Sequence, residues 1–280
     1  MLMSTPYYDL EIVHLENQHV QLDVLAKAGP RIVRLMLPGR PENMLVELPN
    51  FVVSGFHFRG GHRLWHAPEV LPRTYAPDDE GLQIEPLPGG LRLVAPVEAS
   101  TGIQKAIEIR LNPDRAGVRL THHLTNTGPW AVELAAWALT MLPPGGEAVL
   151  PLPVGNADAT GLLPNRRLAL WPYTRFDDPR VTWRDAEDAI RIQAVPGPTP
   201  IKVGYFSTAG WLSYARNGVL FRKRFVVQPD ATYPDFGCNA ECYCGNEFIE
   251  LESVGPLVRL QPGATTLHIE DWEIDVLAIG

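Results

Sequence analysis

The chain has 280 residues, of which 45% are hydrophobic and 20% charged, and its formal net charge is −8 at pH 7. This composition is typical of a globular protein and excludes an intrinsically disordered chain. The acidic balance argues against a nucleic-acid-binding surface and against attachment to an anionic membrane, whereas a neutral ligand such as a sugar stays open.

Targeting signals are not evident in the sequence. No apolar run approaches the length of about 18 residues that a membrane span needs. The opening MLMSTPYYDLEIVHLENQ lacks the basic and apolar segments of a secretory signal. We therefore expect a cytoplasmic protein without a membrane partner.

The three cysteines are Cys238, Cys242 and Cys244. An odd and clustered set does not resemble the disulfide framework of a secreted domain. The spacing C-x3-C-x-C also matches no common zinc pattern, and there is no fourth cysteine. We expect buried or half-buried thiols, and we expect neither a metal nor a cofactor.

The 24 glycines and 27 prolines are spread along the chain and separate short alternating runs, which favours many strands and turns over βαβ units. Residues 8–15 and 19–25 are expected to form a hairpin. A third strand is expected over 31–37, followed by a turn at 38–43.

The clearest meander spans residues 81–126. Its four expected strands, 81–87, 91–99, 105–112 and 117–126, are separated by turns rich in glycine and proline. The next strand, 132–142, is more apolar, which is typical of a strand covered on both faces.

Residues 151–200 are expected to form irregular loops with a few short strands, and 184–191 a single short helix. The remaining expected strands are 201–205, 210–215, 220–227, 247–253, 257–260 and 266–278. More than a dozen short strands, without a linker or repeat, predict an all-β protein: one large antiparallel β-sandwich domain spanning 1–280.

A first candidate site lies in the stretch from Phe248 to Glu252, which alternates strictly between polar and apolar residues after its aromatic start. In a strand, Glu250 and Glu252 face one side together with Phe248, while the aliphatic side chains face the other. Two carboxylates beside an aromatic ring are suited to acid–base work on a polar ligand. The alternative is a half-solvated strand with ordinary polar residues outward.

A second candidate is the segment 56–69, FHFRGGHRLWHAPE, interpreted as a ligand-contacting loop. Gly60 and Gly61 allow a turn or a close backbone approach to a ligand. Arg63 can bind hydroxyls or a carboxylate, and Trp65 can stack on the apolar face of a sugar. The alternative is a loop in which Trp65 fills the core.

The same segment contains His62-x3-His66-x2-Glu69, a spacing that resembles a metal site. Pro68 disfavours the helix that would place the two histidines on one face. A metal-dependent enzyme using His62 and His66 is therefore the least favoured alternative.

A third candidate is the histidine pair in strand 117–126. His122 shares its register with apolar residues, which is typical of a core histidine that has its hydrogen bonds satisfied. His123 points to the more polar face with Arg119 and is the better site candidate.

Trp and Tyr residues are frequent between 130 and 214. Most are expected in the core, and some in a stacking wall beside Arg166, Arg167 or Arg175. The sequence contains no G-x-S-x-G, no glycine-rich phosphate loop and no H-E-x-x-H, so serine hydrolase, nucleotide-binding and zincin functions lack support.

Three stretches resemble the galactose mutarotase-like superfamily. These are AGPRIVRL with the following GRPEN within 28–43, LTNTG at 124–128, and ELES followed by LQPGA within 250–264. More narrowly, GGHRLWHAPE and NEFIELESVGP look like an uncharacterised branch of that superfamily. The resemblance implies a large antiparallel β-sandwich of the supersandwich type.

The resemblance also implies a mechanism. In mutarotases a Glu accepts the proton of the anomeric hydroxyl and a His protonates the ring oxygen. Glu252 matches the Glu best, Glu250 comes second, and Arg63 matches an Arg that binds sugar hydroxyls. The family's Asn-His-x-Tyr-Phe motif should fall near 136–139, where this sequence has no His.

Together these observations predict a carbohydrate-binding protein, with a cleft on a concave sheet and a free sugar or sugar derivative as its small-molecule ligand. In the catalytic form, an aldose 1-epimerase-like isomerase, Glu252 is the base and His62 or His123 the acid, with His66 as a further substitute. The alternative is a sugar-binding module that has lost catalysis, and a homodimer is left open. The expected substrate-binding residues are Arg63, Trp65, His66, Glu247, Phe248 and Glu250.

Overall fold

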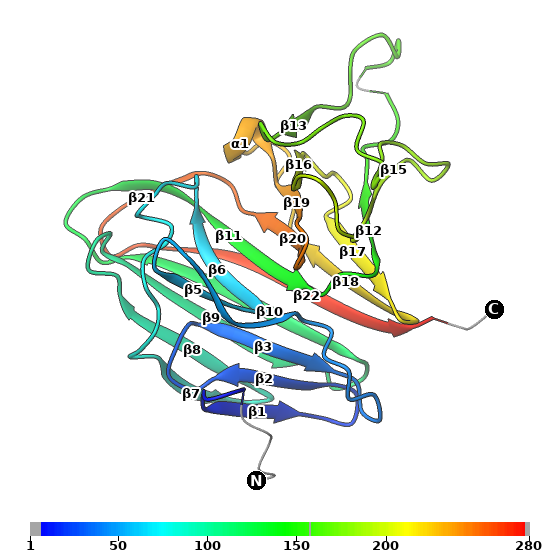
Figure 1. Cartoon of the computed structure of the whole chain (residues 1–280). Helices are drawn as coiled ribbons and strands as arrows, with labels where there is room; N and C mark the ends of the chain where they lie inside the picture. Colours follow the sequence, from blue (N-terminus) through cyan, green and yellow to red (C-terminus); the bar gives the residue numbers. More distant parts are fainter. Residues whose placement is uncertain (1–6, 157, 278–280) are drawn as a thin grey trace.

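The computed structural model describes residues 7–156 and 158–277 (Figure 1). The structure contains two antiparallel sheets of ten strands each and a separate two-stranded hairpin. The predicted all-β class and the large antiparallel sandwich are confirmed. No helix among the described residues has the length and apolar character needed to cross a membrane.

The first sheet runs from β1 at the bottom of Figure 1, through β3 and β6, to β16 and β13 near the top. In spatial order its strands are β1 (Ile12–Glu16), β2 (Gln21–Leu25), β3 (Arg31–Met36), β6 (His62–Ala67), β11 (Val132–Leu142), β20 (Ile249–Val254), β19 (Ala240–Cys244), β16 (Ile201–Tyr205) and β13 (Leu168–Leu170), with β21 (Val258–Leu260) also paired to β11.

The second sheet contains the predicted meander as four consecutive neighbours. Its order is β14 (Val181–Thr182), β15 (Ala189–Gln193), β12 (Glu147–Pro151), β17 (Trp211–Arg216), β18 (Val219–Phe225), β22 (Thr265–Val276), β10 (Gly117–Asn126), β9 (Ile103–Leu111), β8 (Gly90–Val97) and β7 (Gln83–Leu87). The one helix of the described residues is a single turn, α1 (Pro234–Gly237).

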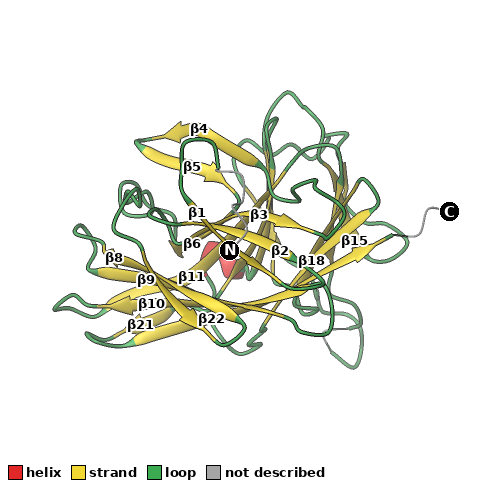
Figure 2. Ribbon diagram, turned by 90° about the horizontal axis from the view of Figure 1, so that it is seen from below, coloured by secondary structure: helices red, strands yellow, loops and turns green. Residues whose placement is uncertain are grey.

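The main core lies between the two sheets and is built from alternate residues of their strands. A second apolar cluster lies on the outer face of the first sheet, where the hairpin of β4 (Glu47–Val53) and β5 (Phe56–Gly60) covers it. Figure 2 shows this hairpin well apart from β8 and β9 of the second sheet. The first sheet is therefore covered on both faces around β6 and β11.

Gly60 and Gly61 form the tight connection between the hairpin and β6, with φ values of 77° and 69°. A Cβ on Gly60 would lie 2.0 Å from the carbonyl oxygen of Val46, and a Cβ on Gly61 1.9 Å from that of Ile32. The close approach predicted for this pair is made to neighbouring backbone, because the chain passes close to the residue before β4 and to β3 here.

Two predicted elements are wrong. The helix expected over 184–191 is a turn, in which the Asp185 carboxylate accepts the backbone N–H groups of Glu187 and Ala189, and it leads directly into β15. The loop expected over 56–69 contains β5 and β6, and β6 is an interior strand between β3 and β11. The sequence of β6 did not predict a strand, because both of its faces are buried and its polar and apolar residues do not alternate.

The other predicted strands are confirmed within a few residues, from the first hairpin to β22. The last residue of the strand expected over 266–278 lies outside the described residues. The sequence did not reveal the β4–β5 hairpin, β12 or β19.

Candidate functional site

A polar row crosses the outer face of the first sheet. Leu139 of β11 pairs with Arg63 of β6 on one side and with Glu252 of β20 on the other. Glu252 in turn pairs with Glu241 of β19. Directly paired residues of neighbouring strands point to the same face, so this register aligns an arginine and two carboxylates.

A second row runs parallel to the first, two residues along each strand. Glu250 of β20 pairs with Tyr243 of β19, which pairs with Lys202 of β16. The intervening residues of these strands, such as Ile249, Leu251 and Cys242, face the core between the sheets. The strict alternation of β20 thus separates the carboxylates from the aliphatic side chains as the sequence predicted.

Residues of both rows line a cavity of about 210 Å³. Arg63, Lys202 and Glu250 line its polar side, and Glu69 stands at its exposed edge. Aromatic rings form most of the remaining wall: Phe51, Trp65, Tyr75, Tyr173, Tyr243 and Phe248. A polar floor enclosed by rings is the usual composition of a small-molecule site.

Arg63 and Glu250 form a buried ion pair, with Nη1 2.9 Å from Oε1. The guanidinium also stacks 4.1 Å from the ring centre of Trp65 and 4.8 Å from that of Phe58. Burial raises the pKa of the Glu250 carboxyl, and the charge of Arg63 offsets only part of this shift. Glu250 is 6% exposed and borders the cavity, so it can exchange a proton with a ligand.

Lys202 is the second buried cation. Its Nζ lies 2.9 Å from both Glu241 and Glu252, and it stands 4.7 Å and 4.6 Å from the ring centres of Trp137 and Trp171. Burial alone would lower the pKa of Lys202, but the two carboxylates together raise it well above its ordinary value. Burial raises the pKa of Glu241 well above its ordinary value, although the charge of Lys202 opposes this shift.

Glu252 has no exposed surface. One of its oxygens accepts hydrogen bonds from Trp137 Nε1 at 2.8 Å and from Lys202 Nζ at 2.9 Å. It lies beneath Lys202 and outside the cavity wall, while Phe248 and Glu250 of the same face belong to the wall. The structure therefore brings Arg63, Trp65, Phe248 and Glu250 together at the cavity. Glu252 lies next to them on the same face of the sheet but does not border the cavity.

The histidines expected as acids lie elsewhere. His62 and His66 point to the opposite face of β6 from Arg63, into the interior. His66 pairs with Glu98 at 3.2 Å, away from the cavity. His123 lies on the outer face of the second sheet, 3.4 Å from Glu108. A strand alternates its faces, so His62 and Arg63, as neighbours in one strand, cannot serve the same site.

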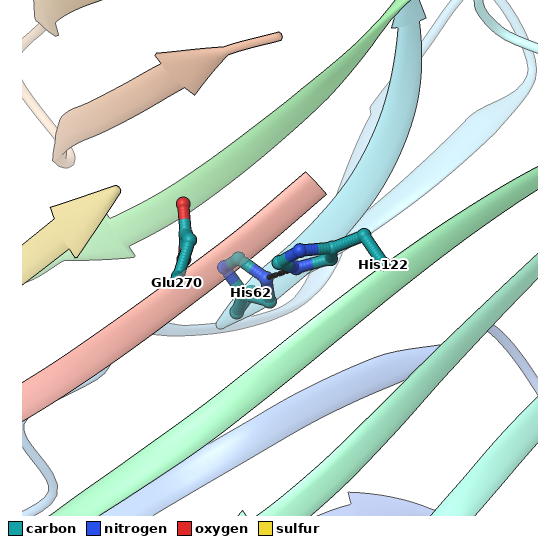
Figure 3. A group of neighbouring side chains, drawn as sticks. All are labelled: His62, His122 and Glu270. Carbon is teal, nitrogen blue, oxygen red and sulfur yellow. Dashed lines mark hydrogen bonds between the residues drawn. The ribbon is translucent and has the colours of Figure 1, made fainter. Parts of the chain in front are cut away.

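His62 belongs to a polar cluster between the sheets (Figure 3). Its Nε2 lies 2.8 Å from Nε2 of His122, and the two rings and the Glu270 carboxylate place their ligand atoms within 4.8 Å of one another. The predicted core position of His122 is confirmed. The Lys223 ammonium lies 2.7 Å from Glu270, so a lysine of the protein balances the charge of this carboxylate. The residues of the metal-like spacing, His62, His66 and Glu69, do not converge, because Glu69 accepts a hydrogen bond from Tyr75 on the other face.

The remaining expectations concern Glu247, the cysteines and the aromatic wall. Glu247 is exposed in the turn before β20 and does not line the cavity. The three cysteines are buried free thiols, as expected. The rings stack on Lys202 and Arg63, whereas Arg166 and Arg175 pair with Asp188 and Asp177 outside the cavity.

Sequence reasoning missed Lys202, Glu241, Tyr75 and Tyr243. Lys202 is the charged residue of the otherwise apolar strand IKVGY, and that signal was available. In AECYC the polar residues alternate with cysteines in the same way. Tyr75 lies in a loop without any periodic pattern, so only the fold places it at the site.

A second cavity, of about 290 Å³, lies between the loop 37–44 and the β17–β18 hairpin. Of its charged side chains, Arg216 and Glu42 pair with each other at the surface, and Arg40 is exposed. Its other lining residues are uncharged, and no buried carboxylate or ammonium among the described residues lines it. We therefore assign the candidate functional site to the cavity at Glu250.

These observations define a β-sandwich with a charged, ring-lined cavity on the outer face of one sheet. The chain has a galactose mutarotase-like fold, since it resembles a galactose mutarotase-like protein from Lactobacillus casei, with a TM-score of 0.65 and 12% identity over 95% of this chain and 100% of that one. A candidate aldose 1-epimerase from Escherichia coli K12 gives a TM-score of 0.63 and 12% identity over 96% and 100% of the two chains.

A TPR-domain-containing protein from Parabacteroides distasonis gives a TM-score of 0.66 and 13% identity over 97% of this chain. The match covers 48% of that longer chain, so this fold spans about half of it. No family model matches the sequence, and no curated protein matches it. At these identities the likeness shows the fold alone.

Proposed function

We propose that this protein binds a free carbohydrate of monosaccharide size in the cavity beside Arg63 and Glu250. The observation that carries the proposal is a pair of buried N–H donors of the cavity wall without a hydrogen-bond partner among the described residues, Arg63 Nε and Trp65 Nε1, beside the Glu250 carboxylate. Such atoms cost free energy unless a ligand satisfies them. A hydroxyl group both donates and accepts, so a polyol suits donors and acceptors placed side by side.

The aromatic wall supports the same ligand class. The rings of Phe248 and Tyr243 lie together, with centres 5.5 Å apart, on one side of the cavity. Apolar C–H faces of a sugar ring can pack on such rings while its hydroxyls reach the charged floor. The solved structures of like fold include proteins named for mutarotase and epimerase activity, which supports a carbohydrate ligand by analogy of fold.

A second candidate function is anomer interconversion, favoured by the position and raised pKa of Glu250. In this reaction Glu250 accepts the proton of the anomeric hydroxyl, the carbonyl forms as the bond from the anomeric carbon to the ring oxygen breaks, and the ring oxygen takes a proton. Reclosure on the other face gives the other anomer. A carboxylate whose pKa is raised toward neutrality is a better base near pH 7.

The acid in this scheme has to come from the cavity wall. Burial raises the pKa of Tyr243, so its hydroxyl keeps its proton, and it lies beside Glu250 in the register. Glu252 then acts indirectly by holding Lys202 in place, since its own carboxylate does not border the cavity.

The test combines binding and exchange measurements on a panel of free aldoses. Saturation-transfer NMR reports binding, and exchange spectroscopy on the anomeric protons reports interconversion. For an isomerase, Glu250→Gln should lower exchange on the order of 10²-fold, the usual scale for losing a general base. Wild-type binding without exchange would leave the non-catalytic binding protein as the function.

The matched control is Glu247→Gln, in the same segment but exposed and outside the cavity. It should leave both measurements unchanged. If no aldose of the panel binds to the wild type, or if Glu250→Gln and Glu247→Gln behave alike, the proposal is wrong.

A further inference from the structure

Both cations at the cavity are already neutralised by the protein. Arg63 lies 2.9 Å from Glu250, and Lys202 lies 2.9 Å from each of two carboxylates, Glu241 and Glu252. A cation that is paired at this distance in a buried site has little attraction left for an anionic ligand. Any phosphate or carboxylate that entered would have to displace one of these partners.

The carboxylates outnumber the cations. Glu69 adds a further negative charge at the edge of the cavity, where its carboxylate accepts the Tyr75 hydroxyl at 2.5 Å. Burial raises the pKa of Glu241, so this residue can be neutral. Glu69, Glu250 and Glu252 still exceed Arg63 and Lys202 by one charge. With Glu250 ionised in its pair with Arg63, the formal charge of these residues is therefore negative, whichever form Glu241 takes.

The ring system adds to the effect of this charge. The resident cations cover the faces of Phe58, Trp65, Trp137 and Trp171. Other rings of the wall, including those of Tyr173, Tyr243 and Phe248, face the cavity without such a cation among the described residues. The electron-rich face of an aromatic ring attracts an ammonium group most strongly where water is excluded.

We propose that this cavity selects its ligand by charge, so that an amino sugar carrying a free ammonium group binds more tightly than the corresponding neutral sugar, and a sugar acid or sugar phosphate is rejected. The proposal rests on the carbohydrate-binding function above and specifies its ligand class. The ammonium would lie between the open ring faces and the carboxylates of Glu69 and Glu250.

The experiment compares ligands that differ mainly in charge. Glucosamine, glucose and glucuronate form one series, and galactosamine, galactose and galacturonate another. Each is titrated at low salt and at a pH where the amine is protonated, with heteronuclear NMR of the labelled protein as the readout. We expect the amino sugar to bind about tenfold more tightly than the neutral sugar and the uronate at least tenfold more weakly, the scale of one partly screened charge interaction.

Glu69→Gln provides the variant, because it removes one cavity charge while leaving the Arg63–Glu250 and Lys202–Glu252 pairs intact. It should reduce the preference for the amino sugar over the neutral sugar several-fold. Glu247→Gln, outside the cavity, should leave the preference unchanged. Raising the salt concentration should also narrow the preference.

A probe without a sugar ring separates the proposed cation preference from the proposed carbohydrate binding. Tetramethylammonium, compared with tert-butanol as an uncharged molecule of similar size, reports on cation binding alone. If no sugar binds but tetramethylammonium shifts the resonances of cavity residues in the wild type and less in Glu69→Gln, carbohydrate binding is wrong and the cation preference stands. Equal affinity across a sugar series, or tighter binding of the uronate, overturns the charge selection and leaves carbohydrate binding intact. If neither the sugars nor tetramethylammonium bind, both are wrong.

Discussion

At the scale of single residues, Lys223 is a charged side chain with no exposed surface. Its ammonium lies 2.7 Å from Glu270 and donates to the carbonyl oxygens of Ala138 and Leu251 at 3.1 Å and 3.0 Å. Those two carbonyls belong to β11 and β20, directly behind the cavity floor. One interior lysine therefore joins the second sheet to β20, which carries Glu250 and Glu252, and to its neighbour β11.

Replacing Lys223 with Met should destabilise the protein by about 3 to 5 kcal/mol, because Glu270 would keep a buried charge without its partner. Adding Glu270→Gln should recover part of this loss. Chemical denaturation of the three proteins measures both effects. Lys27→Met, which removes an exposed ion pair with Glu11, is the control and should change stability little. A Lys223→Met protein as stable as the wild type would contradict this account of the interior.

At the scale of elements, strand periodicity was predictable and pairing partners were not. The alternation of polar and apolar residues in β20 predicted from the sequence alone that Glu250 and Glu252 share one face. The sequence could not show that β19 and β16 would lie beside β20, because strands far apart in the chain pair through tertiary contacts. Lys202 and Tyr243 were missed for that reason. The histidines were assigned to the site by residue type alone, and the alternation of β6 excludes His62 once Arg63 is placed.

The connection between β5 and β6 depends on Gly61. Gly61→Ala would place a Cβ 1.9 Å from the carbonyl oxygen of Ile32 at a φ of 69°, and should cost about 3 kcal/mol or more. Gly218, with a φ of 72° and no atom within 4 Å of such a Cβ, is the matched control. Its replacement by Ala should cost about 1 kcal/mol, from the backbone alone. Equal losses in thermal or urea unfolding would show that the close approach is unimportant.

At the scale of the whole molecule, the interior between the sheets contains an ionisable layer that links folding to pH. Burial lowers the pKa of His268 to about 3, and its ring hydrogen-bonds Ser253 Oγ at 2.6 Å. The folded-state pKa is below the ordinary value of 6.5, so the unfolded chain binds this proton first. The contribution of His268 is therefore complete above pH 6.5 and is lost as the pH falls toward 3.

His268→Gln can keep the hydrogen bond to Ser253 but cannot titrate. Between pH 6.5 and pH 5 the wild type should lose about 2 kcal/mol relative to the variant, at about 1.4 kcal/mol per unit of pH. Urea unfolding of both proteins at several pH values gives the difference directly. A difference that stays constant with pH would show that His268 titrates normally in the folded protein.

The two buried faces of β6 have one further consequence, which concerns the length of the strand. Arg63 and Trp65 form part of the cavity wall, and His62 belongs to the interior cluster. An insertion or deletion of a single residue within β6 would exchange these faces, so the wall and the interior would lose their side chains in one event. Point substitutions can change either face alone. Over evolutionary time this strand can therefore diverge in residue identity on each face independently, while its number of residues stays fixed.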